Sequence, residues 1–166
     1  MRPLNALTAT TGTRTDCWNT PKEVLKNVYK MFPKLELDPC CNDKKNPNVV
    51  AQRYFDEADD GLSQSWNADT VFMNHPYSNS KLWIPYAVSQ YQLHNNEMLL
   101  LIKLDISTKW FREIAKYPWL AYNKRLKFGD GKSAAPFQSA MVYLGTRVEQ
   151  FHNVFGKDGF IYSTTF

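Results

Sequence analysis

The sequence "DTVFMNHPYSN", residues 69–79, predicts both the class of fold and the place of a functional site. Its first half is a continuous apolar run, typical of a strand that is buried on both faces in a parallel sheet. Its second half turns abruptly polar, at Asn74, His75, Pro76, Tyr77 and Ser78. Because ligands bind beyond the carboxyl ends of the strands in open α/β sheets, we expect a binding site at this polar tip.

Strand-like and helix-like segments alternate on both sides of this stretch. Apolar runs predict strands over residues 34–38, 53–55, 69–74, 97–105, 119–129 and 137–145. Helical spacing predicts helices over residues 20–32, 80–94 and 108–117, and residues 46–52 could hold a short one. The alternation predicts an α/β domain with a largely parallel central sheet over residues 17–166, preceded by a flexible N-terminal arm over residues 1–16.

Local signals add detail to the predicted helices. Thr20 is a candidate cap of the first helix, with Pro21 at its first helical position. Pro85 should kink the second helix or mark its first turn. Ser78 or Ser80 could cap that second helix.

Composition sets the broad class of protein. The chain has 166 residues, which fits one domain, and its 20 basic and 16 acidic residues give a net charge of +4. That mild excess permits a polyanionic partner without demanding one. The longest apolar run, residues 98–102, is too short to cross a bilayer, and residues 1–16 lack the apolar core of a signal peptide, so a cytoplasmic protein is expected.

Cysteine and histidine usage argues against disulfides and zinc. The three cysteines, Cys17, Cys40 and Cys41, are odd in number and two are adjacent, which suits a reducing compartment. The three histidines, His75, His94 and His152, do not supply a fourth ligand at zinc-finger spacing. We therefore predict no metal site.

The polar tip has a chemistry of its own. Asn74 offers a side-chain carbonyl, and Pro76 pushes His75 toward an extended conformation that holds the His75 backbone carbonyl outward. Tyr77 places a flat ring beside these two acceptors. Together they could receive an amino group on a planar ring; the alternative is an ordinary strand-to-helix turn, since Asn, Pro and Ser are common turn residues.

Six short motifs follow one another along most of the chain. They are Trp18-Asn19-Thr20-Pro21, Leu37-Asp38-Pro39-Cys40, Tyr54-Phe55 with Asp60-Gly61-Leu62 and Trp66, Asn74-His75-Pro76-Tyr77-Ser78, Trp110-Phe111, and Arg125 with Phe128. In kind and order they resemble those of the phage-type DNA N6-adenine methyltransferases, whose catalytic motif is Asn-Pro-Pro-Tyr-Ser. Each motif is weak alone, but their shared order over more than a hundred residues is a strong indication.

The resemblance implies a fold, a reaction and a cofactor. The fold would be a three-layer, Rossmann-like methyltransferase domain, and the reaction a methyl transfer from S-adenosylmethionine to the N6 amino group of adenine in DNA. The implied catalytic residues are Asn74, His75, Pro76 and Tyr77, around a base flipped out of the duplex. The implied cofactor-binding residues are Trp18, Thr20, Pro21, Asp38, Pro39, Cys40, Phe55, Asp60 and Leu62.

Individual roles follow from the same resemblance. Asp38 would accept from the ammonium group of the cofactor, Asp60 from its adenine amino group, and Phe55 would pack on that adenine. The ribose contact could be Asp56 or Glu57. Alternatively, the acidic run that contains both is only a solvated turn.

DNA contacts are expected from basic and aromatic residues of the second half. The implied set is Ser78, Lys109, Trp110, Arg112, Arg125, Lys127 and Phe128, with Lys103 and Lys124 as further phosphate contacts. For Trp119 and Tyr122, core packing is the favoured interpretation. Sequence specificity would come from loops such as residues 128–137 and from the N-terminal arm.

The sequence also departs from the family pattern. His75 stands where the family has proline, and an imidazole can hydrogen-bond, titrate near neutral pH or crowd the target base. The loop after Asp38 lacks the glycines that many methyltransferases use there. Alternative hypotheses are therefore an impaired or inactive homologue that binds nucleic acid or cofactor, or a methyltransferase acting on RNA or a protein glutamine.

Overall fold

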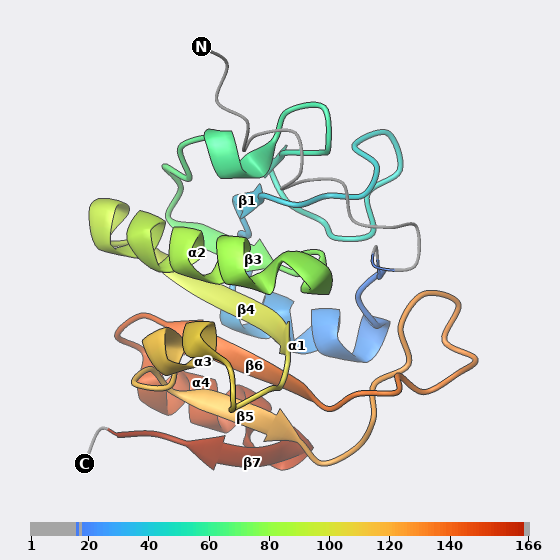
Figure 1. The fold of residues 1–166 in the computed structure, drawn as a ribbon, viewed down its shortest axis with the longest axis vertical. Helices are drawn as coiled ribbons and strands as arrows, with labels where there is room; N and C mark the ends of the chain where they lie inside the picture. The colour runs from blue at the N-terminus through green and yellow to red at the C-terminus, as the bar shows by residue number, and fades with distance from the viewer. Residues whose placement is uncertain (1–15, 17, 165–166) are drawn as a thin grey trace.

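A seven-stranded mixed sheet with helices on both faces organises the computed structural model, which describes residues 16 and 18–164 (Figure 1). The strands lie in the order β2-β1-β3-β4-β6-β5-β7. Their bounds are β1 Leu37–Asp38, β2 Arg53–Tyr54, β3 Thr70–Met73, β4 Glu97–Lys103, β5 Trp119–Tyr122, β6 Ser139–Leu144 and β7 Gly159–Tyr162. The predicted α/β class is confirmed.

The direction of the strands changes halfway across the sheet. Strand β1 pairs in parallel with β2 and β3, and β3 pairs in parallel with β4. The pairs β4–β6, β6–β5 and β5–β7 are antiparallel. The prediction of a largely parallel sheet is therefore wrong for this half. A strand that is buried on both faces has the same continuous apolar sequence whether it is parallel or antiparallel to its neighbour. Strand β6 is such a strand, so its sequence could not reveal the reversal.

Among the residues that the structure describes, four α-helices cover the sheet. Their bounds are α1 Lys22–Met31, α2 Ser80–His94, α3 Lys109–Ile114 and α4 Val148–Phe155, with short 3-10 turns η1 Gly61–Ser63, η2 Tyr77–Asn79 and η3 Gly156–Asp158. Helices α2 and α3 lie on the near face in Figure 1, and α1 and α4 lie on the far face. The sheet thus separates the apolar interior into two clusters, and one pair of helices covers each of them.

Alternation along β4 shows how one strand serves both clusters. Leu99 and Leu101 point into the cluster that contains the buried residues of α1 and α4. Met98, Leu100 and Ile102 point into the cluster that contains those of α2 and α3. All five side chains are fully buried, and burial of each stabilises the fold by about 1.5–3 kcal/mol. This strand is the centre of the domain.

Several predicted helix ends differ from the structure. Pro21, and not Thr20, is the N-cap of α1, because the Thr20 hydroxyl is engaged with Asn74 instead. Asn79 is the N-cap of α2, so neither Ser78 nor Ser80 has that role. Pro85 lies inside α2 rather than in its first turn. The short helix suggested for residues 46–52 is absent, since these residues form bends and irregular loop.

Helix α4 and strand β7, which follow residue 145, were not predicted. Helix α4 carries Phe151 and Phe155 four residues apart, and both are fully buried against the sheet. That spacing is a helical pattern that the sequence does contain. The predicted arm lies outside the described residues, except for Asp16. Among residues 16 and 18–164, the structure has no helix with the length and apolar character needed to span a membrane.

The topology gathers the carboxyl ends of five strands at one edge of the sheet. Strands β1, β2, β3 and β4 are parallel and end there. Strand β5 runs in the direction of β4, since both are antiparallel to β6. In Figure 1 this edge is at the right, where the orange loop of residues 123–138 and the residues leading into α1 also lie. The polar tips after β1 and β3 therefore share one edge, as predicted.

Candidate functional site

Three polar segments meet at this edge. Asn74, directly after β3, and Cys40, which follows β1, line the same cavity. The Asn74 side-chain Nδ2 donates to the backbone carbonyl of Trp18 at 2.8 Å and to the Thr20 hydroxyl at 3.0 Å. Residues 18–21, 38–40 and 74–77 therefore form one site, although they are far apart in the sequence.

The contacts of Asn74 define which way its amide faces. A backbone carbonyl can only accept, so the group facing Trp18 must be the amide nitrogen. The Asn74 Oδ1 consequently faces Tyr77, whose hydroxyl donates to it at 2.9 Å. An amide oxygen has two lone pairs, so Oδ1 retains capacity for one more donor. Asn74 is thus a fixed acceptor at the tip of β3.

Asn48 supports this arrangement and was not predicted. Its Oδ1 accepts from the Thr20 backbone N–H at 2.7 Å, and its Nδ2 donates to the Thr20 carbonyl at 3.3 Å. Thr20 is 3% exposed, so these bonds satisfy backbone groups that have little access to water. The repeated asparagines of "CNDKKNPN", residues 41–48, were the feature that could have indicated such a role.

A small cavity lies between these three segments. Its volume is about 20 Å³, enough for roughly one water molecule. It is lined by Trp18, Asn19, Thr20, Asp38, Cys40, Cys41, Asn42, Asn48, Val49 and Asn74. Four of the predicted cofactor residues and the predicted catalytic asparagine therefore face the same space.

Asp38 is a buried carboxyl in this cavity. It is 5% exposed, and its Oδ1 accepts from the Cys40 backbone N–H at 3.1 Å. Burial raises the pKa of Asp38 to about 7, against the hydrogen bonds from Cys40 that lower it. Burial also raises the pKa of the Cys40 thiol well above its usual range. A cation in the cavity would favour the ionised form of Asp38.

The segment around Gly61 packs directly onto the Asp38-Pro39-Cys40 tip. A Cβ on Gly61 would lie 2.0 Å from the Pro39 carbonyl oxygen, so only glycine fits there. The buried Trp66 ring donates from Nε1 to the Gly61 carbonyl at 2.8 Å. Neighbouring Asp60 has φ 54°, a left-handed conformation that is uncommon for a residue with a side chain. Its Oδ1 is buried without a hydrogen-bond partner among the described residues.

Of the other predicted cofactor residues, Phe55 and Leu62 lie next to this packed turn, whereas Pro21 belongs to the segment of residues 18–21. Phe55 N–H donates to the Asp38 carbonyl at 3.0 Å, which places Phe55 directly beside the tip. Phe55 and Leu62 are partly buried and pack against the cluster of α2 and α3. Pro21 lies at the start of α1, next to Thr20.

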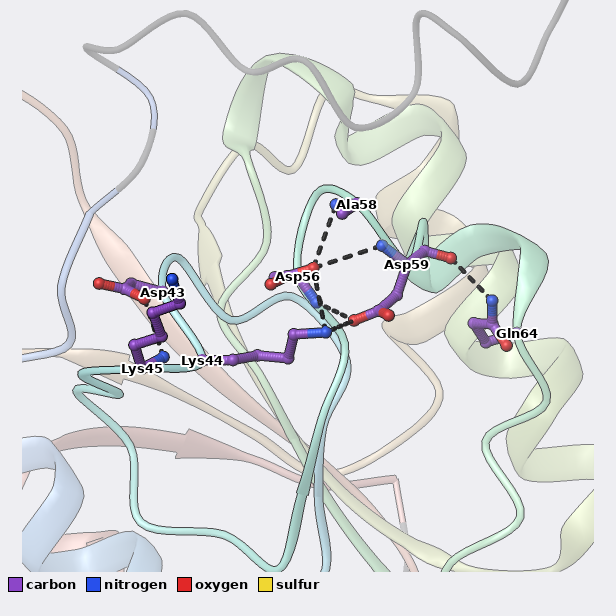
Figure 2. Close-up of polar contacts among 7 residues, drawn as sticks. All are labelled: Asp43, Lys44, Lys45, Asp56, Ala58, Asp59 and Gln64. Carbon is purple, nitrogen blue, oxygen red and sulfur yellow. Dashed lines mark hydrogen bonds and ion pairs between the residues drawn. The ribbon is translucent and has the colours of Figure 1, made fainter.

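The acidic run after β2 forms a self-contained turn (Figure 2). Asp56 Oδ1 accepts from the backbone N–H groups of Ala58 and Asp59, at 3.1 and 3.3 Å. Lys44 Nζ lies 3.5 Å from Asp56 Oδ1 and 2.7 Å from Asp59 Oδ2. The turn therefore has an internal structural role, which the sequence suggested as one of two interpretations. It also borders an open hollow of about 440 Å³, lined in part by Asp56, Glu57 and Asn42.

His75 is buried and neutral. It is 1% exposed, and its Nε2 lies 2.8 Å from the Ser80 hydroxyl, which itself donates to the Tyr77 carbonyl. Because a hydroxyl has one hydrogen to donate, His75 Nε2 must be the protonated nitrogen and donate to Ser80. Burial lowers the pKa of His75 to about 3. The imidazole therefore hydrogen-bonds, as one of the expectations held, and does not titrate near neutral pH.

Tyr77 is enclosed by aromatic rings. It is 9% exposed, and its ring makes edge contacts with Phe128 and Phe137 at centroid distances of 6.2 and 5.4 Å. The Trp18 ring contacts the same two phenylalanines. The loop that carries them is attached to the site by the Gly129 N–H, which donates to the Asn19 carbonyl at 3.1 Å. Phe128, a predicted DNA contact, thus lies beside Tyr77, and Phe137 is an addition.

The predicted DNA-binding residues fall into two groups. Ser78 is exposed and its backbone N–H donates to the Asp16 carboxylate, while Arg125 and Lys127 are exposed on the loop at the site edge. Lys109, Trp110 and Arg112 lie on α3, where the Trp110 ring packs against Phe111. Trp119 and Tyr122 belong to the apolar clusters, so the expectation of core packing is confirmed.

Comparison with known proteins adds a family match. The family described as "DNA N-6-adenine-methyltransferase (Dam)" matches residues 7–144. A DNA N-6-adenine-methyltransferase of Escherichia phage T1 is 30% identical over 99 residues, which are 59% of this chain and 40% of that protein. A DNA N-6-adenine-methyltransferase of Haemophilus phage HP1 (strain HP1c1) is 33% identical over 97 residues, 58% of this chain and 54% of that protein. The matched regions thus cover about half of each relative's length.

Proposed function

Because this chain belongs to the DNA N-6-adenine-methyltransferase (Dam) family, we propose that it transfers a methyl group from S-adenosylmethionine to the N6 amino group of adenine in DNA. The fixed Asn74 amide carries this proposal. Its nitrogen is held by Trp18 and Thr20, and its oxygen is presented at the tip of β3 beside the Asp38 cavity. An acceptor in a preset orientation suits a reaction in which an amino group must be positioned.

The residues around the cavity fit the proposed methyl donor. The buried Asp38 carboxyl suits the donor's ammonium group, which would offset the burial that raises the Asp38 pKa. The unpartnered Oδ1 of Asp60 suits an adenine amino group, and the Phe55 ring a flat purine. The hollow that Asp56 and Glu57 border meets the cavity at Asn42, which lines both, and suits a ribose. The cavity of about 20 Å³ would have to widen to admit a donor of this size.

The donor supplies a methyl group on a positively charged sulfur. The protein's own part is to make the adenine amino group nucleophilic, because its lone pair is otherwise delocalised into the ring. Asn74 Oδ1 and the His75 carbonyl would accept its two N–H groups and draw the nitrogen toward a tetrahedral geometry. The donor would supply its methyl group to this nitrogen, with the electron pair of the broken S–C bond left on sulfur and the proton of the nitrogen released to water. Alignment of this kind accounts for up to about 7–11 kcal/mol of a barrier in favourable cases.

The target adenine must leave the duplex to reach Asn74, since a paired base is not accessible. Tyr77 is the proposed stacking surface, but its ring is 9% exposed and is covered by Phe128 and Phe137. Base entry would therefore require the loop of residues 123–138 to move. Arg125 and Lys127 on that loop, with Ser78, are the proposed phosphate contacts at the site.

The remaining proposals follow from the family. The sheet with helices on both faces would be a Rossmann-like methyltransferase domain over residues 17–166. Lys109, Trp110 and Arg112 on α3 would contact more distant DNA. The host cytoplasm is the proposed place of action, and methylation of a phage genome the proposed purpose.

The test is a methylation assay with purified protein, labelled S-adenosylmethionine and duplex and single-stranded DNA, followed by digestion to nucleosides. We expect label in N6-methyladenosine, and at least a hundredfold loss in Asn74→Ala, by the scale of removing one preorganised partner of a reacting group. Ser107→Ala, an exposed change on the loop after β4, is the matched control. No N6-methyladenosine from the native chain under any condition would refute the proposal.

One observation favours a second candidate. His75 replaces the family's proline and is buried against Tyr77, with ring centroids 5.3 Å apart. An impaired homologue that only binds DNA or cofactor would show methylation in His75→Pro and none in the native chain. Robust native activity excludes this candidate, and competition among DNA, RNA and glutamine-containing peptides separates the other acceptors.

A further inference from the structure

A second cavity lies at the same edge of the sheet, between α1 and the segment that follows β5. Its volume is about 160 Å³, several times that of the cavity beside Asp38. Leu126 lines it, and Phe128, two residues further on, contacts Tyr77. Val24 of α1 forms part of its apolar wall. The cavity thus neighbours the proposed methylation site without containing any of its catalytic residues.

The charged lining of this cavity is mainly basic. Four lysines line it, Lys26, Lys30, Lys124 and Lys157, against two carboxylates, Glu23 and Asp158. One carboxylate is paired with a lysine, and the other accepts from a neutral amide, so the four lysines exceed the two carboxylates by two charges. Glu23 binds the Lys124 ammonium at 2.6 Å, and Asp158 accepts from the Asn27 amide at 2.5 Å. Within residues 16 and 18–164, the three remaining lysines form no ion pair, so the cavity presents ammonium groups that a bound anion could neutralise.

Tyr122 provides an unused donor in the same place. It is 4% exposed, lines the cavity and has a buried hydroxyl without a hydrogen-bond partner among the described residues. Burial, and after it the negative charges of Asp158 and Glu23, raises the pKa of Tyr122 above its usual range. The phenol is therefore protonated at physiological pH and can donate. Buried polar groups in native proteins normally have a partner, and the Tyr122 hydroxyl therefore retains a hydrogen for a water molecule or for the acceptor oxygen of a ligand.

We propose that this cavity binds a phosphate group, held by Lys26, Lys30 and Lys157 and by the Tyr122 hydroxyl. A phosphate offers several strong acceptor oxygens, which suit three ammonium groups and one phenol. Since the cavity adjoins the methylation site, the phosphate belongs to the DNA strand that carries the target adenine. This assignment to DNA rests on the proposed function, whereas the phosphate site itself does not.

Two variants test the site while keeping the fold. Lys26→Gln/Lys30→Gln changes two exposed residues of α1, and Tyr122→Phe removes one hydroxyl and keeps the buried ring. Lys22→Gln is the matched control, because Lys22 is exposed on the same helix and does not line the cavity. Binding of a labelled duplex is measured by fluorescence anisotropy over a range of salt concentrations.

For the native chain and Lys22→Gln we expect nearly parallel salt dependences. For the double lysine variant we expect the negative slope of log K against log[salt] to become shallower by about 1, the value for one lost phosphate contact. For Tyr122→Phe we expect roughly tenfold weaker binding, the size of one charge-assisted hydrogen bond. Inorganic phosphate is the second probe: it should raise the melting temperature of the native chain more than that of either cavity variant.

The outcomes separate this inference from the proposed function. Unchanged DNA binding in both variants, together with no difference in stabilisation by phosphate, overturns the site even if the native chain methylates DNA. Loss of phosphate stabilisation with unchanged DNA binding supports the phosphate site and assigns it to a free phosphate or nucleotide. A reduced salt slope in a chain without methylation supports the site while the proposed function fails.

Discussion

Asp38→Asn provides a direct test of the buried carboxyl at the centre of the proposed site. Asparagine has the same shape and keeps an oxygen that can accept from the Cys40 N–H, but it does not titrate. In the native chain the pKa of Asp38 is raised from 3.8 to about 7 by burial. Between these values the folded chain keeps a proton that the unfolded chain has lost, so the free energy of unfolding falls as pH rises.

His75 acts in the opposite direction. Its pKa is lowered from 6.5 to about 3 by burial, so in that interval the unfolded chain takes up a proton that the folded chain refuses. This contribution to the free energy of unfolding therefore rises with pH. Each contribution has a slope of about 1.4 kcal/mol per pH unit, so between about pH 4.5 and 6 they nearly cancel in the native chain. In Asp38→Asn the contribution of His75 remains unopposed.

We therefore expect the free energy of unfolding of Asp38→Asn, relative to the native chain, to increase by about 2 kcal/mol between about pH 4.5 and 6. Urea unfolding followed by tryptophan fluorescence at several pH values measures this difference. Asp130→Asn, at an exposed position on the loop between β5 and β6, makes the same chemical change away from the cavity and is the control. A difference between Asp38→Asn and the native chain that stays constant with pH would refute the burial argument.

Three further predictions follow. The dissociation constant for S-adenosylmethionine, measured by calorimetry, should fall about tenfold per pH unit as pH rises from 5 toward 7, because its ammonium group binds the ionised Asp38. Asp38→Asn should weaken binding and make the dissociation constant nearly independent of pH. Gly61→Ala should lower the free energy of unfolding by at least about 1–3 kcal/mol through its clash with the Pro39 carbonyl, whereas Gly156→Ala, which meets an ordinary side-chain contact, should cost less; equal values in urea unfolding would contradict this. Tyr77→Phe should keep the fold and lower kcat about tenfold through loss of the hydrogen bond to Asn74, and an unchanged kcat would remove that bond from the mechanism.

The sequence was informative where one physical signal dominated. The apolar runs of β3 and β4 are buried in the sheet, and the tips that follow β1 and β3 meet at one edge. These features follow from burial and from the rule for strand ends in α/β sheets. The reversal of direction after β4 was missed because a strand that is buried on both faces carries no mark of its direction.

Within the site, residue types were easier to predict than their contacts. Asn74 was a plausible acceptor from sequence, but its orientation depends on the Trp18 carbonyl, 56 residues away. Threonine is a common N-cap residue, yet the Thr20 hydroxyl accepts a hydrogen bond from Asn74 instead. Here a tertiary contact outweighs a local preference. Asn48 and Phe137 were missed because neither belongs to a motif, and their roles arise only from the folded chain.

The grouping of strand ends has a practical consequence for labelling the protein. Three connections lie at the edge opposite the site: those before β4, before β5 and between β6 and α4. Strands β4 and β5 end at the site and β6 begins there, so the opposite end of each strand joins one of these connections. Asn95 and Thr146 are exposed in two of these connections. A dye, affinity tag or surface tether attached there would leave both cavities unobstructed. This half of the molecule can therefore be anchored for single-molecule measurements while the opposite edge stays open to DNA.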